Sequence, residues 1–342
     1  MCSIIEADMA WDSDVRPQKI LYNNSVPADI ARSILSVVLK TDLTEENLLK
    51  SLKPVIDPAG HYCLHNGKEK LFLRVTRRSR KNTDIEDLVT NHLFDTGITV
   101  NLPIVSQLTI HWGGHAYLLS VFHFIEGRHF DGSDSDLASL SLAVARMHEA
   151  LRSFNSADDI HAAALKTAER LSNTKEIVAQ LLKTKNFSLF YDRREWAERN
   201  YEWLKMMVEG FNPYLCQEPD AQCVHGELHS GNVIFSLQDG PVILIDFEET
   251  PDAWFPPAFD IAYLVHRFCM DQNISKGLFN SRLKIVEDNY GKIPSGLKNM
   301  MRQVCWYNIA LLIDRSIRRE SVSSEKEYDK FVKLENMTSR LQ

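Results

Sequence analysis

The chain has 342 residues, of which 44% are hydrophobic and 25% charged, so it is long enough to bury two cores and too apolar to be disordered. Its 39 basic and 46 acidic residues give a formal charge of −7, which argues against nucleic acid as a partner. No apolar run is long enough to span a membrane, and the acidic N-terminus lacks a signal-peptide pattern, so we expect a cytoplasmic protein with no membrane partner.

The first third of the chain predicts a helix followed by an antiparallel sheet. Residues 25–41 have the apolar spacing of an amphipathic helix. Residues 52–78 contain short alternating runs separated by the Asn-Gly dipeptide at 66–67, which is typical of hairpin turns. Residues 84–98 predict a second helix, and residues 117–127 predict a further strand.

From about Asp131 onward the pattern is helical, apart from a strand pair near residue 240. Residues 136–151 and 194–210, for example, have apolar faces and polar backs. We therefore expect the boundary between a sheet-rich part and a helical part near residues 125–131. The six cysteines are scattered and form no CxxC pair, which predicts buried thiols.

The strand pair consists of residues 233–237 and 242–245. A three-residue loop between them would place Asn232 opposite Asp246 and bring an amide oxygen close to a carboxylate. Such a pair suits Mg²⁺, which keeps several waters and binds substrate phosphates. An Asx turn beside a strand-end Asp is the alternative, and a two-residue loop would shift the register by one and separate the pair.

The polar bend before these strands contains two histidines, His225 and His229, which raise the possibility of a zinc site. A helical zinc motif needs its Glu directly after the first His, whereas Glu227 lies midway between them. Gly226 would also break such a helix. We therefore interpret both histidines as structural.

The bend and the acidic strand end have a spacing found in protein kinases. Glu227 precedes Asn232 by five residues, as the catalytic base precedes the metal-binding Asn there, and an acidic segment follows. The chain resembles the aminoglycoside phosphotransferase and choline kinase family, the small-molecule kinases, in two motifs: His225-Gly226-x-Leu228-His229-x-Gly231-Asn232 and Ile245-Asp246-Phe247-Glu248.

This resemblance implies an α+β, bilobal protein-kinase-like fold. Residues 1–125 would form an antiparallel-sheet N-terminal lobe that binds the nucleotide, and residues 126–342 a mainly helical C-terminal lobe for catalysis and acceptor binding. ATP, or GTP, would sit between the lobes with Mg²⁺. The implied site comprises a base, three metal ligands and four nucleotide-binding residues: Glu227; Asn232, Asp246 and Glu248; Arg74, its ion-pair partner Glu86, and the backbones of His123 and Ile125.

Several of these residues have plainer alternatives. Arg74 could be an exposed strand residue, and Asp84 and Asp87 compete with Glu86 as its partner. Glu248 could be a solvated acid rather than a ligand of a second metal. The strand that contains the two backbone contacts fits a core strand equally well.

Other residues are interpreted as structural. Asp260 lies in a segment that resembles the family's, and we expect it to cap the following helix and brace the bend. Five aromatic side chains in the helical part could stack on an acceptor or pack in the core, and their spacing favours the core: Trp196, Tyr201, Trp203, Trp306 and Tyr307.

The expected function is transfer of the γ-phosphoryl group of a nucleotide to a hydroxyl of a small molecule, such as an antibiotic, amino alcohol, sugar or nucleoside-like metabolite. The family normally has Asp where this chain has Glu227. That departure leaves a nucleotide-binding pseudokinase or regulator, with a partner protein, as the alternative. A protein kinase proper is disfavoured because the Gly-rich loop and the A-P-E segment are absent from the sequence.

Overall fold

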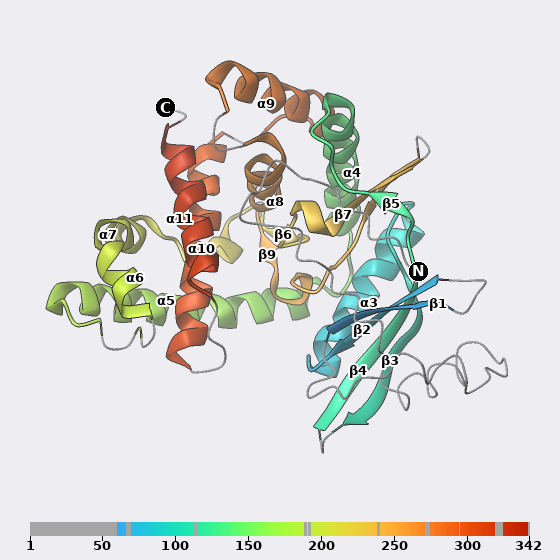
Figure 1. Ribbon diagram of the computed structural model, residues 1–342, viewed down its shortest axis with the longest axis horizontal. Helices are drawn as coiled ribbons and strands as arrows, with labels where there is room; N and C mark the ends of the chain where they lie inside the picture. Colours follow the sequence, from blue (N-terminus) through green and yellow to red (C-terminus); the bar gives the residue numbers. More distant parts are fainter. Residues whose placement is uncertain are drawn as a thin grey trace. The chain divides into compact units, whose positions relative to one another are not determined.

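The computed structural model describes residues 60–65, 70–112, 115–187, 190, 193–237, 240–270, 274–293, 295–318 and 324–340 (Figure 1). The chain forms two compact units: Met1–Asp131 with Gly231–Glu248, and Gly132–Ser230 with Glu249–Gln342. The helix expected at 25–41 and the turn expected at 66–67 lie outside the described residues.

Unit 1 contains a four-stranded antiparallel sheet, as the alternating patterns predicted. Its strands, in spatial order, are β1 (Gly60–His65), β2 (Lys70–Thr76), β4 (His115–His123) and β3 (Pro103–Trp112). Alternate residues of β2 point into the core, where Leu71, Leu73 and Val75 are buried. Arg74, between Leu73 and Val75, is therefore held at a fixed position on the strand.

Helix α3 (Arg80–Asp95) follows β2 and confirms the second predicted helix. Its N-cap Ser79 accepts a hydrogen bond from the Asn82 amide at 3.2 Å, and its apolar face includes Val89 and Leu93. Gly97, with φ 84°, follows the helix. Left-handed backbone of this kind costs glycine little, and it ends the helix near the predicted end.

A second, three-stranded sheet in unit 1 is formed by β5 (Gly127–Arg128), β7 (Val233–Ser236) and β8 (Val242–Leu244). A Cβ at Gly127 would lie 2.3 Å from Ile234 Cγ2, so close pairing of β5 with β7 requires glycine there. In β7 and β8, Val233 lies opposite Leu244. The predicted register, with Asn232 opposite Asp246, is therefore wrong by one residue.

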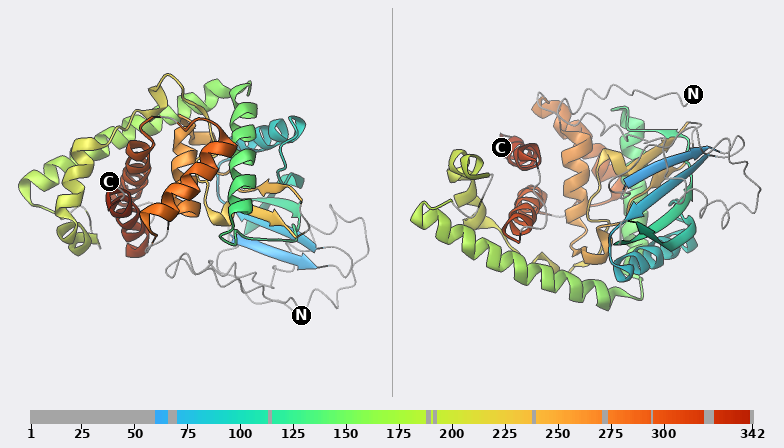
Figure 2. Two further views of the ribbon diagram at one scale, coloured as in Figure 1. Left: turned by 90° about the horizontal axis from the view of Figure 1, so that it is seen from above. Right: turned by 60° about the horizontal axis from the view of Figure 1, so that its bottom comes forward.

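Among the described residues, unit 2 is mainly helical with one short antiparallel pair of strands, and Figure 1 labels its α-helices and these two strands. The elements are α4 (Asp134–Arg152), α5 (Ala157–Thr184), α6 (Arg194–Arg199), α7 (Tyr201–Gly210), η2 (Leu215–Gln217), β6 (Gln222–Cys223), η3 (Ser230–Asn232, shared with unit 1), η4 (Thr250–Asp252), β9 (Trp254–Phe255), α8 (Ala258–Leu264), the π-helix η5 (Val265–Cys269), α9 (Lys276–Tyr290), α10 (Leu297–Ile317) and α11 (Glu325–Arg340). The 28-residue α5 packs against α7 and α10 (Figure 2), and α4 packs against α9.

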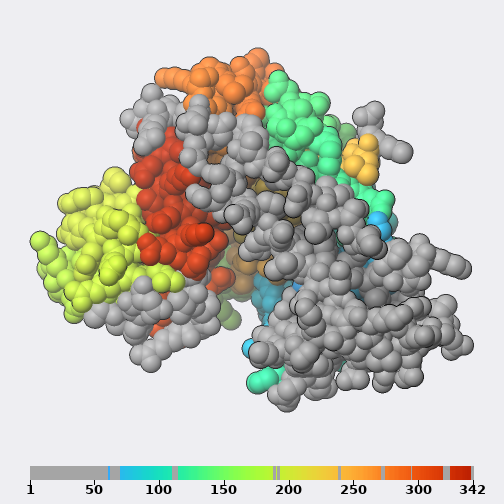
Figure 3. All heavy atoms as spheres, in the orientation of Figure 1, coloured from blue at the N-terminus to red at the C-terminus, as the bar shows by residue number. Residues whose placement is uncertain are grey.

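The aromatic side chains of unit 2 pack mainly in its core, as their spacing favoured. Trp196, Trp203, Trp306 and Tyr307 are buried. Trp196 Nε1 donates to Asp329 Oδ1 at 2.9 Å, so α6 lies beside α11, and the surfaces of these segments adjoin in Figure 3. The four described cysteines are free and buried, which agrees with the predicted thiols: Cys216, Cys223, Cys269 and Cys305.

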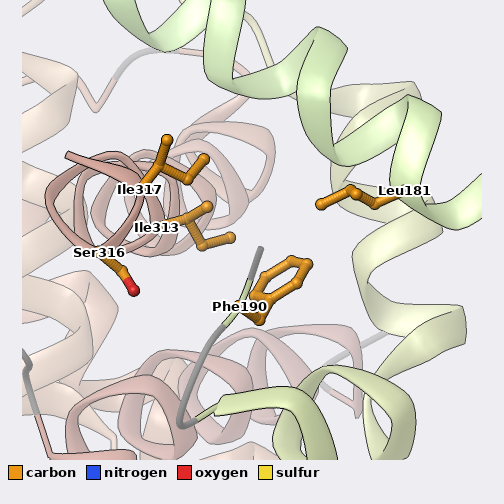
Figure 4. A pocket seen from close by; sticks show the side chains of 5 residues that line it. All are labelled: Leu181, Phe190, Ile313, Ser316 and Ile317. Carbon is orange, nitrogen blue, oxygen red and sulfur yellow. The ribbon is translucent and has the colours of Figure 1, made fainter. Parts of the chain in front are cut away.

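A small crevice lies between α5 and α10, where Leu181 and Phe190 face Ile313 and Ile317 (Figure 4). Four of its five lining side chains are apolar, and its empty space, open solvent included, is only about 170 Å³. We therefore assign it to helix packing. None of the helices among the described residues combines the length and apolar composition needed to cross a bilayer.

His266, in η5, is expected to make unit 2 sensitive to acid. Its Nε2 lies 2.9 Å from Thr338 Oγ1, and burial lowers its pKa to about 3. Below pH ~6.5 an unfolded histidine takes up a proton that the native one does not, so stability is lost as pH falls from there toward the native pKa. The loss is on the order of 5 kcal/mol in all. Urea unfolding from pH 7 to 4 should show a shallower decline for His266→Gln, and equal slopes would contradict this assignment.

Candidate active site

Arg74, on β2, forms a buried ion pair with Glu86 on α3. Its Nη1 lies 2.7 Å from Glu86 Oε1, and the two side chains are 8% and 7% exposed. The guanidinium also lies 5.7 Å from the centroid of the Phe122 ring. Burial alone would lower the pKa of Arg74, but Glu86 and nearby carboxylates outweigh it and raise that pKa. The predicted pairing is confirmed, and Arg74 is a permanently charged group.

The two competing acids of α3 have other surroundings. Asp84 is exposed. Asp87 accepts hydrogen bonds from Ser106 and from Gln107 Nε2, the latter at 2.8 Å. Glu86 shares the buried face of α3 with Val89, and helical geometry thus selects it over its neighbours.

Asp246 follows β8 and also approaches Arg74. Its Oδ1 lies 3.6 Å from Arg74 Nη1, so one guanidinium links Glu86 to Asp246. The Asp246 side chain is 30% exposed, and its φ is 63°, in the left-handed region. That conformation ends the regular alternation of the strand immediately after Ile245.

Asn232, at the end of η3, is buried and directly precedes β7. Its carbonyl accepts a hydrogen bond from the Ile245 amide at 3.0 Å, which continues the observed strand register. In a regular ladder Asp246 would then point to the opposite face from Asn232. The left-handed turn at Asp246 removes that constraint, so the shared metal role of Asn232 and Asp246 stays a prediction.

Glu248 has a partner that the sequence interpretation did not assign. Arg78, just beyond β2, places Nη1 3.4 Å from Glu248 Oε2, with side chains 22% and 36% exposed. Glu248 is therefore ion-paired rather than simply solvated. The signal in the sequence was the run of basic residues after β2, which looked like an exposed strand end.

The predicted adenine contacts lie at the end of β4. Leu71 pairs with His123, and the Phe124 amide donates to the Lys70 carbonyl at 3.0 Å. Because hydrogen-bonded pairs alternate in an antiparallel ladder, the backbone N–H and C=O groups of His123 point away from β2. The His123 carbonyl accepts from Asn101 Nδ2 at 3.3 Å. The nucleotide contacts of His123 and Ile125 stay predictions.

Glu227 belongs to unit 2, on the bend between β6 and η3. Its side chain is 36% exposed, and Oε1 lies 3.8 Å from His229 Nε2. Gly226, before it, has φ 87°, and a Cβ there would lie 2.8 Å from Ala253 Cβ. The bend thus requires glycine. His225 is buried and accepts the Glu227 amide at Nδ1, 3.3 Å away.

No group of three or more His, Cys, Asp or Glu side chains among the described residues is arranged to hold a metal ion. A magnesium site built from one Asn, one Asp and phosphate oxygens would not form such a group.

Asp260 accepts hydrogen bonds from the bend but does not cap helix α8. It is the third residue of α8, whose N-cap is Pro257, so the predicted cap is wrong. The fully buried carboxylate accepts the His225 and Gly226 amides at 2.8 and 2.9 Å, and His148 Nε2 lies 3.0 Å away. Burial alone would raise the pKa of Asp260, but the His148 hydrogen bond and the neighbouring groups outweigh it and lower that pKa.

This network extends to two elements that the sequence did not connect with the bend. His148, on α4, has its Nδ1 2.9 Å from the hydroxyl of Tyr290 at the end of α9. Gln222 Nε2 donates to the His148 carbonyl at 2.8 Å. The bend that carries Glu227 is thus held by buried hydrogen bonds to α8 and, through Asp260, to α4.

The model of the phosphotransferase enzyme family matches residues 60–278. No curated protein sequence matches the chain.

Solved structures of small-molecule kinases share the fold at low sequence identity. Spectinomycin phosphotransferase APH(9)-Ia, bound to AMP, gives a TM-score of 0.59 at 14% identity, with 89% of this chain and 93% of that chain covered. The amicoumacin kinase hAmiN, in complex with AMP-PNP and Ca²⁺, gives 0.54 at 15% identity, with 87% and 94% covered. An ethanolamine kinase of Plasmodium vivax gives 0.51 at 12% identity, with 92% and 96% covered. The expected α+β protein-kinase-like fold is confirmed.

Proposed function

Because the chain belongs to the phosphotransferase enzyme family, we propose that it is a small-molecule kinase, which transfers the γ-phosphoryl group of ATP or GTP to a hydroxyl group of a small molecule. The observation that carries this proposal is the position of Arg74, a buried cation that contacts Glu86 and Asp246 together. Phosphoryl transfer depends mainly on positioning and on neutralising charge. A fixed cation beside a partly exposed carboxylate suits both requirements.

The residues of unit 1 fit a nucleotide with Mg²⁺. Arg74 Nε is buried and has no hydrogen-bond partner among the described residues, so the guanidinium retains a donor for a phosphate oxygen. Asn232 and Asp246 offer the amide and carboxylate oxygens that Mg²⁺ prefers. When bound, Mg²⁺ would neutralise charge on the phosphates. The backbone of His123 and Ile125 would contact the purine.

The residues of unit 2 supply the acceptor chemistry in this proposal. Glu227 accepts the proton of the attacking hydroxyl, for which it needs an accessible carboxylate on a fixed backbone. Its side chain is 36% exposed, while Asp260 holds the two amides before it. The usual family residue is Asp, and the extra methylene of Glu227 requires the acceptor to lie about one bond length farther from the bend.

The acceptor belongs to the class of small hydroxyl compounds. The proteins with this fold act on antibiotics in two cases and on ethanolamine in a third, as their names state, which supports an antibiotic, an amino alcohol or a similar metabolite. The 155–220 segment has nearly balanced acidic and basic residues, which argues against a polycationic aminoglycoside.

Release of ADP or GDP, measured with Mg²⁺ and a panel of hydroxyl compounds, tests this function. We expect turnover with at least one acceptor, and Glu227→Gln should lower kcat by roughly 10²–10⁴-fold because the base is lost. Glu227→Asp restores a carboxylate and should keep most of the activity. AMP-PNP affinity should be equal in all three proteins.

Two outcomes would contradict the proposal in different ways. Failure to bind either AMP-PNP or GMP-PNP with Mg²⁺ would remove the nucleotide site altogether. Binding without turnover for any acceptor, or equal kcat for Glu227→Gln and the parent, would instead favour the nucleotide-binding regulator with a partner protein.

A further inference from the structure

Arg78 and Glu248 form an ion pair close to the groups that the proposed function assigns to the nucleotide and its metal. Arg78 Nη1 and Glu248 Oε2 are 3.4 Å apart, and both residues belong to unit 1. The Arg78 amide donates to Thr76 Oγ1 at 3.1 Å, which fixes the backbone where the strand ends. The side chain of Arg78 is 22% exposed. Arg78 is thus a positioned cation rather than a freely solvated one.

The charges around this pair form one cluster. Arg74 contacts Glu86 and Asp246, while Arg78 contacts Glu248. Glu248 is also near enough to Arg74 to raise that residue's pKa. Three carboxylates therefore face two guanidinium groups, which leaves a single negative charge in the cluster before any metal binds.

A second divalent cation at Glu248 would have to compete with Arg78. Mg²⁺ loses its waters reluctantly and needs an accessible carboxylate oxygen with near-octahedral surroundings. A carboxylate whose oxygen lies against a guanidinium is a poorer ligand, because a metal ion there would be repelled by the positive charge of the arginine.

We propose that Arg78 takes the place of a second divalent cation: it holds Glu248 in an ion pair and supplies positive charge toward the nucleotide phosphates. This inference rests on the proposed function. The chain then binds its nucleotide with a single metal ion, held by Asn232 and Asp246. Arg78 Nη1 is buried and makes no hydrogen bond within the described residues, so the group retains donor capacity for a phosphate oxygen.

Counting Mn²⁺ bound to the AMP-PNP complex, by electron paramagnetic resonance and by calorimetric titration, tests this inference without turnover. The parent protein should bind a single Mn²⁺ with each AMP-PNP. Arg78→Gln should bind a second Mn²⁺, because Glu248 becomes available, and Arg78→Lys, which keeps the charge, should bind only one. The double variant Arg78→Gln with Glu248→Gln should return to one.

Arg77→Gln is the matched control. Arg77 is the neighbouring cation, but its Nη2 contacts the Tyr117 hydroxyl at 2.7 Å, so its loss should leave the Mn²⁺ count unchanged. Two Mn²⁺ ions on the parent, or only one on a folded Arg78→Gln protein, would overturn this inference and leave the proposed function standing. A parent protein that binds neither AMP-PNP nor Mn²⁺ would remove both.

Discussion

Replacing Asp246 by Asn is expected to lower kcat by about 10³-fold while the protein stays folded. The change removes a proposed Mg²⁺ ligand and the acid that lies 3.6 Å from Arg74. Metal ions contribute several kcal/mol of transition-state stabilisation, and ~4 kcal/mol corresponds to that factor. Asn is the informative replacement because φ at this position is 63°, a left-handed conformation that Asn tolerates better than most residues.

The rate of ADP or GDP production and the thermal unfolding temperature, measured on the same samples, separate the chemical effect from a folding defect. Asp246→Ala should lose activity equally but should also be less stable, because Ala is strained in left-handed backbone. Asp252→Asn, in η4 of the other unit, is the control and should keep both activity and stability. If Asp246→Asn retained activity within tenfold of the parent, Asp246 would not belong to the metal site.

The ion pair of Arg74 with Glu86 was expected from the family resemblance, and the local patterns of the two elements explain it. Alternation in β2 sets the position of Arg74. The period of α3 then places Glu86 on the buried face with Val89 and leaves Asp84 in solvent. Antiparallel pairing of the first strands and the end of α3 followed from equally local signals.

The register of β7 with β8 was not predictable in the same way. Two loop lengths fit the same residues, and they differ by one residue in pairing. The left-handed φ of Asp246 was not predictable either, because a glycine in the sequence indicates such a conformation and an aspartate does not. The pairing of Arg78 with Glu248 joins segments 170 positions apart in sequence, and no local period connects them.

Asp260 shows how a local rule can mislead. An acidic residue before an apolar helix suggests a cap, but α8 already begins at Ala258 with Pro257 as its N-cap. The carboxylate lies within the helix and faces the bend instead. Its other partner, His148, comes from α4, so only the tertiary structure reveals that this acid holds the bend that carries Glu227.

Replacing Asp260 by Ala is accordingly expected to cost about 3–5 kcal/mol of unfolding free energy. The carboxylate is 0% exposed, and its removal leaves the amides of His225 and Gly226 buried without their acceptor. A buried donor without an acceptor costs about 1–3 kcal/mol. Urea unfolding near pH 7 measures the loss. Tyr290→Phe, which removes only the outer hydrogen bond to His148, should cost about 1 kcal/mol.

The same carboxylate also gives a pH dependence with a defined sign. Its native pKa is lowered below the ordinary value, so its contribution is complete above about pH 4 and declines as pH falls through the native pKa. Asp260→Asn should remove that part of the acid dependence.

In the folded fraction of the Asp260→Asn protein at pH 7, kcat should fall more than AMP-PNP affinity, because the bend positions Glu227 and not the nucleotide. Equal stability of Asp260→Ala and the parent would show that these hydrogen bonds do not hold the bend.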